Sequence, residues 1–295
     1  MSNKPRKMTL EKKHNLTGWA FLAPATFLIA VFSFWPMIKA LVLSFQTGKG
    51  TNMQMAGFTN YIRMFQDDVF LQSIKNTFFY FILQVPIMLV VAMVLACILN
   101  KKDYGLKDFP NNDFLPCTTS LVAYAIIFRS LFANDGLVNY VLVNLGILDN
   151  HIIFDTTICG KNGYHIGSLW RWTGYNMVFF LSGLQNIEYS VYEAAKIDGA
   201  SAIQTFFKIT VPLLKPTILL TAIMSTNGTL QLFDESINLT DGGPANASIS
   251  MSHYIYNLCF KYVPNFGYAA AMSFFILLLV AVLAFIQMRV GDKRD

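Results

Sequence analysis

The side chains with the strongest capacity for chemistry are few and scattered. The chain has four cysteines, at positions 97, 117, 159 and 259, and four histidines, at positions 14, 151, 165 and 253. None of them forms a Cys-x-x-Cys pair or a Cys/His group at a zinc-binding spacing. We therefore expect no metal site and no catalytic thiol. Cys159 and Cys259, which lie between apolar runs, are expected to be free rather than bridged.

A nucleotide-hydrolysing site is not predicted either. The run Gly48-Lys-Gly-Thr51 lacks the leading glycine spacing of the phosphate loop Gly-x-x-x-x-Gly-Lys-Ser/Thr. The sequence also shows no nucleophile with a base at one depth, as an intramembrane enzyme would need. We expect no enzymatic activity and no cofactor in this chain.

Polar side chains within long apolar runs form a second group of candidates: Gln84, Tyr124, Trp172, Thr173, Tyr175, Asn176, Ser225, Asn227, Thr229 and Gln231. Hydroxyls, amides and aromatic faces suit a sugar, which needs many hydrogen bonds and a stacking surface. The alternative is hydrogen bonding between helices, which contributes ~0.6 kcal/mol for each bond in a bilayer. Within this group we favour Tyr175, Asn176, Ser225 and Asn227 as substrate-binding residues.

The stretch from Ser190 to Pro212 carries several helix signals. It reads Ser-Val-Tyr-Glu-Ala-Ala-Lys-Ile-Asp-Gly-Ala-Ser-Ala-Ile-Gln-Thr-Phe-Phe-Lys-Ile-Thr-Val-Pro. Ser190 with Glu193, and Ser201 with Gln204, have the spacing of capping boxes, in which each residue satisfies a free N–H at a helix start. Gly199 lies between them, where a left-handed helix end requires glycine. The stretch predicts two short helices joined by a sharp turn, the second ending at Pro212.

The side chains of this stretch suit contact with a soluble partner. The small residues Ala194 and Ala195 allow a close approach, and Glu193 and Asp198 supply charge. Apolar contacts are offered by Tyr192, Ile197, Ile203 and Phe206. A helix pair that simply lies on lipid headgroups is the alternative, and the residues alone leave both interpretations open.

The amino-acid composition indicates what kind of protein holds these candidate residues in place. Of the 295 residues, 54% are hydrophobic and only 13% are charged, with a net charge of +5. A soluble domain carries about 25% charged residues. A disordered chain, a collagen-like rod and a disulfide scaffold are excluded, and the sequence indicates an all-α, polytopic membrane protein.

Six stretches are long and apolar enough to cross a bilayer, which takes ~20 residues of helix. They are Gly18–Ala40, Phe78–Leu99, Phe114–Phe132, Ile166–Leu184, Leu213–Phe233 and Tyr268–Met288. The first has too long an apolar run for a cleaved signal peptide. The connections Phe45–Lys75, Ala133–His165 and Asp234–Gly267 exceed simple turns, and loops of such length often bind something.

The distribution of Lys and Arg predicts the orientation, because cytoplasmic segments carry the excess of positive charge. With both termini in the cytoplasm, fourteen Lys and Arg residues lie on the cytoplasmic side. Four lie on the external side, namely Lys49, Arg63, Lys161 and Lys261, and the four at span edges are left out of the count: Lys39, Lys75, Arg129 and Arg171. We expect an N-terminal tail at residues 1–15, a six-span domain at residues 16–290 and a C-terminal tail at residues 291–295.

A family resemblance rests on the same polar stretch. Glu193-Ala194-Ala195, then three residues and Gly199, then Ile209-x-Val211-Pro212, resembles the EAA loop of ATP-binding-cassette importer permeases. The wider run Tyr192–Ala200 resembles the carbohydrate branch, that of the longer maltose permease subunit. Further stretches agree with it: Gly57–Tyr61, Asn76-Thr77, Leu181–Ile187 and Leu239–Asn246. The resemblance covers about residues 16–290.

The resemblance implies partners and a mechanism. In this family the EAA loop, here residues 190–212, sits in a groove on a cytoplasmic ATPase. It implies coupling roles for Tyr192, Glu193, Ala194, Ala195, Asp198 and Gly199. It also implies two ATPase subunits that carry the ATP and Mg²⁺, a second six-span permease, an external solute-binding protein and a sugar substrate in a bacterial cell membrane. Closure of the ATPase pair on ATP would turn the spans from inward-facing to outward-facing.

Some features depart from the family pattern, and two other transporter functions are open. Val211 replaces the usual leucine, Arg129 stands where an aromatic residue is common, and Ile158–His165 matches no known pattern. An ion-coupled transporter is disfavoured, because no Asp or Glu lies in the central half of a predicted span. A permease for glycerol phosphate would favour buried cations. Only Arg129 and Arg171 could serve, and with Asp234 and Glu235 they are expected to snorkel or form a rim salt bridge.

Overall fold

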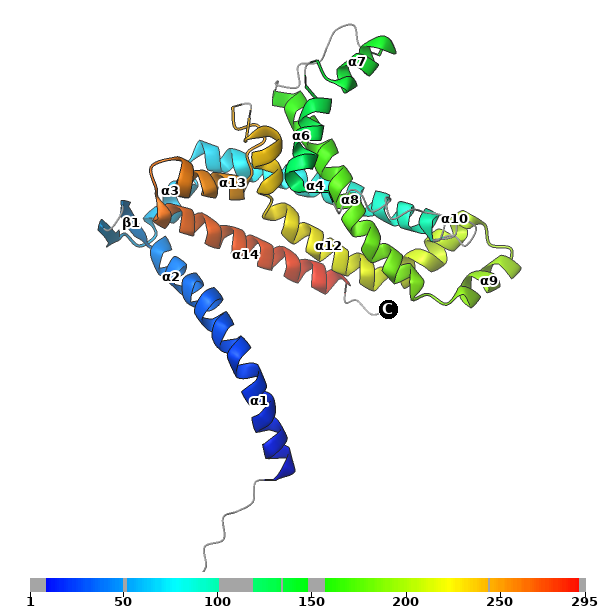
Figure 1. Ribbon diagram of the computed structural model, residues 1–295, viewed down its shortest axis with the longest axis horizontal. Helices are drawn as coiled ribbons and strands as arrows, with labels where there is room; N and C mark the ends of the chain where they lie inside the picture. The colour runs from blue at the N-terminus through cyan, green and yellow to red at the C-terminus, as the bar shows by residue number, and fades with distance from the viewer. Residues whose placement is uncertain are drawn as a thin grey trace, which may run out of the picture.

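The computed structural model describes residues 9–49, 52–100, 119–133, 135–147, 157–243 and 245–291, with the backbone alone for residues 49 and 157–165. These residues are mostly helical, as expected, and they add one short β-hairpin (Figure 1). Residues 1–8 of the predicted N-terminal tail and residues 114–118 of the predicted third span lie outside the described residues. So does the predicted C-terminal tail from residue 292.

The chain begins with a long apolar rod. α1 (Leu10–Ile29), one π-helical turn η1 (Ala30–Phe34) and α2 (Trp35–Ser44) run continuously and include the predicted span Gly18–Ala40. The rod extends away from the remaining helices, and only its α2 end lies beside them (Figure 1). Its apolar side chains are exposed, which a helix tolerates in lipid but not in water.

Four helices form the body of the molecule: α4 (Asp68–Leu99), α8 (Thr157–Gln185), α12 (Lys215–Leu230) and α14 (Phe266–Gly291). They contain most of the second, fourth, fifth and sixth predicted spans. The sequence placed the start of the fourth span at Ile166, whereas α8 begins nine residues earlier within the stretch expected to be an external connection.

By length and apolar character, three described segments could each cross a membrane: Leu10–Ser44, Asp68–Leu99 and Phe266–Gly291. A fourth is added if Ala202–Leu213 and Lys215–Leu230, which meet at a 70° bend, form one broken span. The described part of the third predicted span is the shorter apolar helix α6 (Leu121–Leu131). The geometry therefore supports a membrane protein with three or four such segments.

Small residues bring these helices close together. Ala92 and Ala96 of α4 are fully buried against Phe180 and Leu184 of α8. Gly183 of α8 lies so close to Thr217 of α12 that a Cβ atom there would be 2.9 Å from the threonine hydroxyl. Such contacts are typical of membrane helices, where dispersion forces and small side chains replace the hydrophobic effect.

Short elements cover one end of this bundle. β1 (Gln46–Lys49) pairs with β2 (Asn52–Met55) in an antiparallel hairpin, with Gln46 opposite Met55. They are followed by α3 (Thr59–Met64) and, later in the chain, by η4 (Ser236–Thr240), α13 (Met251–Tyr256) and η5 (Asn257–Lys261). α7 (Leu137–Asn144) projects beyond α6 on another side (Figure 1).

The carboxylate of Asp67 joins three helices, α4, α13 and α14. Its Oδ1 accepts the first N–H groups of α4, from Val69 and Phe70, and so caps the helix. Its Oδ2 accepts the hydroxyls of Tyr254 in α13 at 2.7 Å and Tyr268 in α14 at 2.8 Å. Burial raises the pKa of Asp67, but the four hydrogen bonds outweigh it and hold the pKa below its ordinary value.

Gly267 allows α14 to approach the β-hairpin, and its replacement is the first test of this packing. A Cβ atom at Gly267 would collide with the backbone carbonyl of Gln46. We expect Gly267→Ala to destabilise the folded protein by about 1–3 kcal/mol, the usual cost of overpacking. The matched control is Gly18→Ala, since a Cβ atom there meets nothing within 4 Å. A melting temperature in detergent that is unchanged for both variants would contradict the close approach.

Candidate functional site

The stretch that resembles an EAA loop folds as two short helices with a tight turn. α9 spans Tyr189–Ile197, and α10 (Ala202–Thr205) continues through η3 (Phe206–Thr210) and α11 (Val211–Leu213). We call residues 189–213 the coupling segment. It lies at the end of the bundle opposite the β-hairpin (Figure 1).

The turn between the two helices is a Schellman motif built on Gly199. The glycine has φ +75°, in the left-handed region. Its N–H donates to the Lys196 carbonyl, and the Ala200 N–H donates to the Ala195 carbonyl at 2.9 Å. These bonds satisfy carbonyls that the end of α9 would leave free. The predicted glycine stop is confirmed.

The two predicted capping boxes fared differently. The box of Ser201 and Gln204 is present, with both reciprocal hydrogen bonds formed. The box of Ser190 and Glu193 was wrong: α9 begins at Tyr189, and the Ser190 hydroxyl instead donates to Glu188. The second helical segment also passes Pro212 by one residue, because proline is tolerated in the first turn of α11.

The coupling segment exposes a mixed apolar and acidic surface. Ile197 is 85% exposed, and Ile203 and Phe207 are also largely exposed. Glu193, Ala194, Asp198 and Gly199 are exposed as well. Three of the predicted contact residues lie deeper, since Ala195 is buried and Tyr192 and Phe206 are half-buried.

Tyr192 connects the two helices of the coupling segment. It is half-buried, and its hydroxyl is 3.4 Å from the hydroxyl of the buried Thr210 in η3. The residue therefore braces the segment as well as facing its surface. The coupling roles inferred for these residues remain predictions.

The four favoured substrate residues separate into a buried pair and two exposed side chains. Ser225 of α12 donates to the Oδ1 of Asn176 in α8 at 3.0 Å, and both residues are buried. Asn176 also donates to the Trp172 carbonyl. This is the hydrogen bonding between helices that the sequence left open as the alternative.

Tyr175 and Asn227 are the exposed members. Tyr175 is 41% exposed and lies edge-on to Trp172 and Phe179. Asn227 accepts a hydrogen bond from Gln231 at 2.6 Å, and both of these residues are exposed. Their amide and phenol groups are open to a ligand without breaking a bond between helices.

The sequence predicts snorkelling or a rim salt bridge for Arg129 in α6, Arg171 in α8, and Asp234 and Glu235 after α12. Within the described ranges, no ion pair joins Arg129, Arg171, Asp234 or Glu235. The Glu235 carboxylate is buried and accepts the indole N–H of Trp172 at 2.8 Å instead. A prediction based on charged residues alone does not consider that a neutral indole N–H can bind the carboxylate in place of an arginine.

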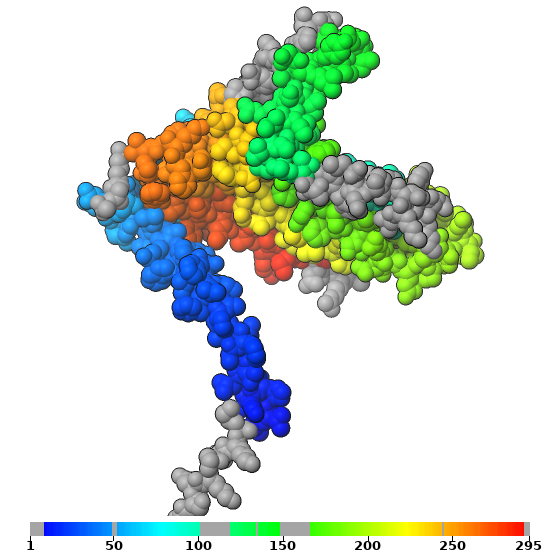
Figure 2. All heavy atoms as spheres, in the orientation of Figure 1, coloured from blue at the N-terminus to red at the C-terminus, as the bar shows by residue number. Residues whose placement is uncertain are grey.

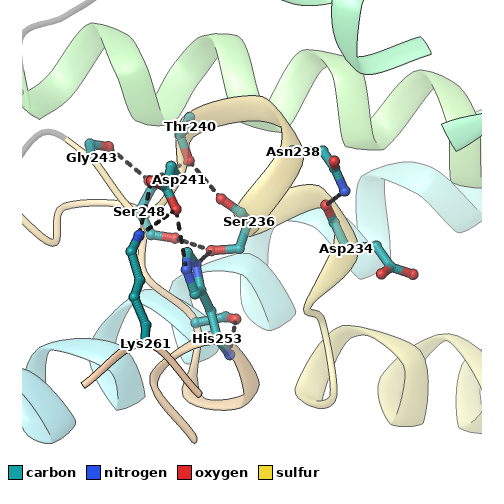
Figure 3. Close-up of polar contacts among 10 residues, drawn as sticks. Asp234, Ser236, Asn238, Thr240, Asp241, Gly243, Ser248, His253 and Lys261 are labelled. Atoms are coloured by element: carbon teal, nitrogen blue, oxygen red, sulfur yellow. Dashed lines mark hydrogen bonds and ion pairs between the residues drawn. The ribbon is translucent and has the colours of Figure 1, made fainter. Parts of the chain in front are cut away.

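The segment between α12 and α14 contains a polar cluster that sequence analysis missed. His253 is fully buried, with its Nδ1 2.9 Å from the Ser236 hydroxyl and its Nε2 3.6 Å from Asp241 (Figure 3). Asp241 also pairs with Lys261 at 3.0 Å. Burial lowers the pKa of His253 and outweighs the attraction of Asp241, which raises it. Burial therefore favours the neutral form of the ring.

Two stretches that the family resemblance named separately meet at this cluster. Asn76 of α4 donates to the carbonyls of Asn246 and Ile249, at 3.1 and 3.0 Å. The hydroxyl of Thr77 accepts the Met251 N–H. Asp241, Ala245 and Asn246 have positive φ angles, so the loop turns tightly enough to present its carbonyls to α4. Nothing in the local sequence signals this pairing.

The comparisons with known proteins agree with this geometry. Residues 55–294 match the family described as binding-protein-dependent transport system inner membrane component. The lactose transport system permease protein LacF of Rhizobium radiobacter is 47% identical over 98% of both chains. The multiple sugar-binding transport system permease protein MsmF of Streptococcus mutans serotype c is 32% identical over 97% of this chain and 99% of the relative.

A solved structure has the same fold. It is a bacterial alginate ABC transporter in complex with an alginate pentasaccharide-bound periplasmic protein, and it aligns with a TM-score of 0.83 at 23% identity over 96% of each chain. A match of the family over most of the chain is decisive, and the family is a transport component rather than an enzyme. The chain belongs to the family of binding-protein-dependent transport system inner membrane components.

Proposed function

We propose that this chain is one permease subunit of an ATP-driven importer for a sugar or oligosaccharide. It would form part of the pathway through the membrane, receive the sugar from an external solute-binding protein and be driven by separate ATPase subunits. Two relatives, a lactose transport system permease and a multiple sugar-binding transport system permease, support the substrate class. The solved relative in complex with a periplasmic protein supports the external partner.

The assembly follows from the same proposal. A second six-span permease, two cytoplasmic ATPases that bind ATP and Mg²⁺, and the solute-binding protein complete the importer. We further propose six spans with both termini in the cytoplasm, residues 16–290 as the permease domain and residues 190–212 as its coupling loop. The support is the excess of Lys and Arg in the segments assigned to the cytoplasm.

The observation that carries the coupling role is the geometry of the turn at Gly199. A rigid turn fixes the angle between α9 and α10, so a push on the exposed apolar face of α9 moves α10 with it. The chain then bends by 70° into α12. Displacement of the coupling segment would therefore reach α12 directly, and α12 carries Ser225 and Asn227.

A second function, the import of a glycerol phosphate, has one relative in its favour. The sn-glycerol-3-phosphate transport system permease protein UgpA of Yersinia pestis is 30% identical over 94% of both chains. A phosphate would need a cation in the pathway. Arg171 instead lies over the ring of Tyr124, 5.6 Å from its centroid. An uncharged sugar is therefore the better match.

The coupling role is tested at Gly199. We expect Gly199→Val to weaken ATPase binding and to slow sugar uptake roughly tenfold, because a β-branched residue in the left-handed region costs about 1–2 kcal/mol. No atom lies within 4 Å of the new Cβ, so the effect would come from the backbone alone. The measurements are uptake in proteoliposomes and co-purification of the ATPase.

The control variant is Gly199→Asn, since asparagine tolerates positive φ better than valine does. It should retain most of the uptake rate. Equal uptake and equal ATPase recovery for the Val variant and the unchanged protein would show that the turn does not transmit the motion.

The substrate role is tested by comparing Asn227 with Ser225. We expect Asn227→Leu to lower sugar uptake several-fold while the complex still assembles, because the exposed amide is lost without a contact between helices. We expect Ser225→Ala to lower the melting temperature of the complex instead, because the buried Oδ1 of Asn176 then loses its donor, a change that costs about 1–3 kcal/mol. Uptake kinetics that are normal for Asn227→Leu would return this residue to a packing role.

A further inference from the structure

α3 and the residue stretch just before it present an apolar surface to the surroundings. Met55 is 71% exposed, Phe58 67%, Ile62 61% and Phe65 58%. We call these four residues the α3 patch. The last three are spaced four and three residues apart, so they lie along one side of the helix and its ends.

The opposite side of α3 is buried and mixed, because the amide of Asn60 and the apolar side chain of Met64 both pack against the body. Asn60 is 2% exposed, and its amide donates to the carbonyls of Ser44 and Gln46 at 2.9 and 2.8 Å. A helix on the surface of a water-soluble protein buries most of its large apolar side chains, whereas Phe58, Ile62 and Phe65 remain exposed here. The hairpin and α3 lie at the end of the bundle where α2 meets α14, and atoms of this region are visible on the surface (Figure 2).

The depth of the α3 patch follows from its contact with α14. The first charged residue in α14 is Arg289, near its C-terminal end. A hydrocarbon layer of ~30 Å corresponds to about 20 helical residues, so it reaches back from Arg289 to about residue 269. Phe275 falls inside this layer. The ring of Phe65 lies edge-on to that of Phe275, with centroids 6.0 Å apart.

The polar groups beside the α3 patch lie nearer to the calculated boundary. The Arg63 guanidinium is 4.4 Å from the centroid of the Tyr268 ring. The Tyr268 hydroxyl donates to Asp67, the residue that caps α4. Charged groups at the boundary with aromatic and aliphatic side chains just below it are the pattern of an interfacial anchor.

The α3 patch also continues onto a larger apolar surface. Phe275, Leu278, Val282 and Phe285 recur at helical spacing along α14, and the last three are exposed. Phe65 therefore extends a stripe that follows α14 through the membrane. A soluble binding protein cannot reach a side chain at the depth of Phe275.

We propose that α3 is an interfacial anchor that lies in the outer boundary of the bilayer, with Ile62 and Phe65 in contact with phospholipid acyl chains. The anchor holds the external ends of α2, α4 and α14 at a fixed depth, because Asn60 binds the end of α2 and Asp67, three residues after α3, binds α4 and α14. This proposal rests on the proposed function only in that the chain must lie in a membrane. It does not depend on which solute the importer carries.

The experiment is photo-crosslinking of the complete importer in its native membrane. The photoreactive residue p-benzoylphenylalanine is incorporated at Ile62, at Phe65 or, as the control, at the exposed Asp68 in the first turn of α4. After irradiation, adducts are identified by mass spectrometry. We expect phospholipid adducts at Ile62 and Phe65 in several-fold excess over Asp68. Retained solute uptake confirms that each variant is folded.

Two results would overturn the anchor. Adducts of Ile62 and Phe65 with a second permease or with the solute-binding protein would make the α3 patch a protein interface. Phospholipid adducts no more frequent than at Asp68 would place it in water. Absence of solute uptake by the unchanged importer, with lipid adducts at Ile62 and Phe65 still formed, would count against the proposed importer function and leave the anchor standing.

Discussion

The structure depends on hydrogen-bond partners for the irregular backbone between α12 and α14. Residues 241–250 contain little helix, yet Ser248, Ile249 and Ser250 are buried. A buried N–H or carbonyl without a partner is costly, and most costly near lipid. Asn76 and Tyr80 of α4 supply donors to the carbonyls of Asn246, Ile249 and Ser248, and Ser236 supplies another. The loop can be buried only because α4 carries these side chains.

This arrangement makes the end of the molecule that bears the β-hairpin one connected unit. Asn76 binds the loop to α4, and Asp67 binds α4 to α13 and α14. The coupling segment lies at the far end, and α12 joins the two ends after its 70° bend. A displacement at the coupling segment would therefore move α12 against a well-held layer at the end of the molecule that bears the β-hairpin. The exposed Asn227 and the buried Ser225 lie on the helix that would move.

Local chemistry explains which features the sequence predicted. The Gly199 turn and the Ser201 capping box depend on residues within a few positions of each other, so their spacing is sufficient evidence. Ser190 has the same spacing but lies inside α9, because the helix begins one residue before it. The pairing of Asn176 with Ser225 depends on how α8 and α12 are rotated. The contact of Asn76 with Asn246 spans 170 residues, and no local pattern encodes it.

The most direct test of this account is hydrogen exchange of the loop in an Asn76→Leu variant of the assembled protein. Leucine has a similar size but leaves the carbonyls of Asn246 and Ile249 without their donors, at a cost of about 1–3 kcal/mol. We expect the amides of residues 246–251 to exchange about tenfold faster, since ~1.4 kcal/mol corresponds to a factor of ten. Gln72→Leu, which removes only a side chain that donates to Asn76, should have a smaller effect. Unchanged exchange in the Asn76 variant would contradict the claim that α4 holds this loop.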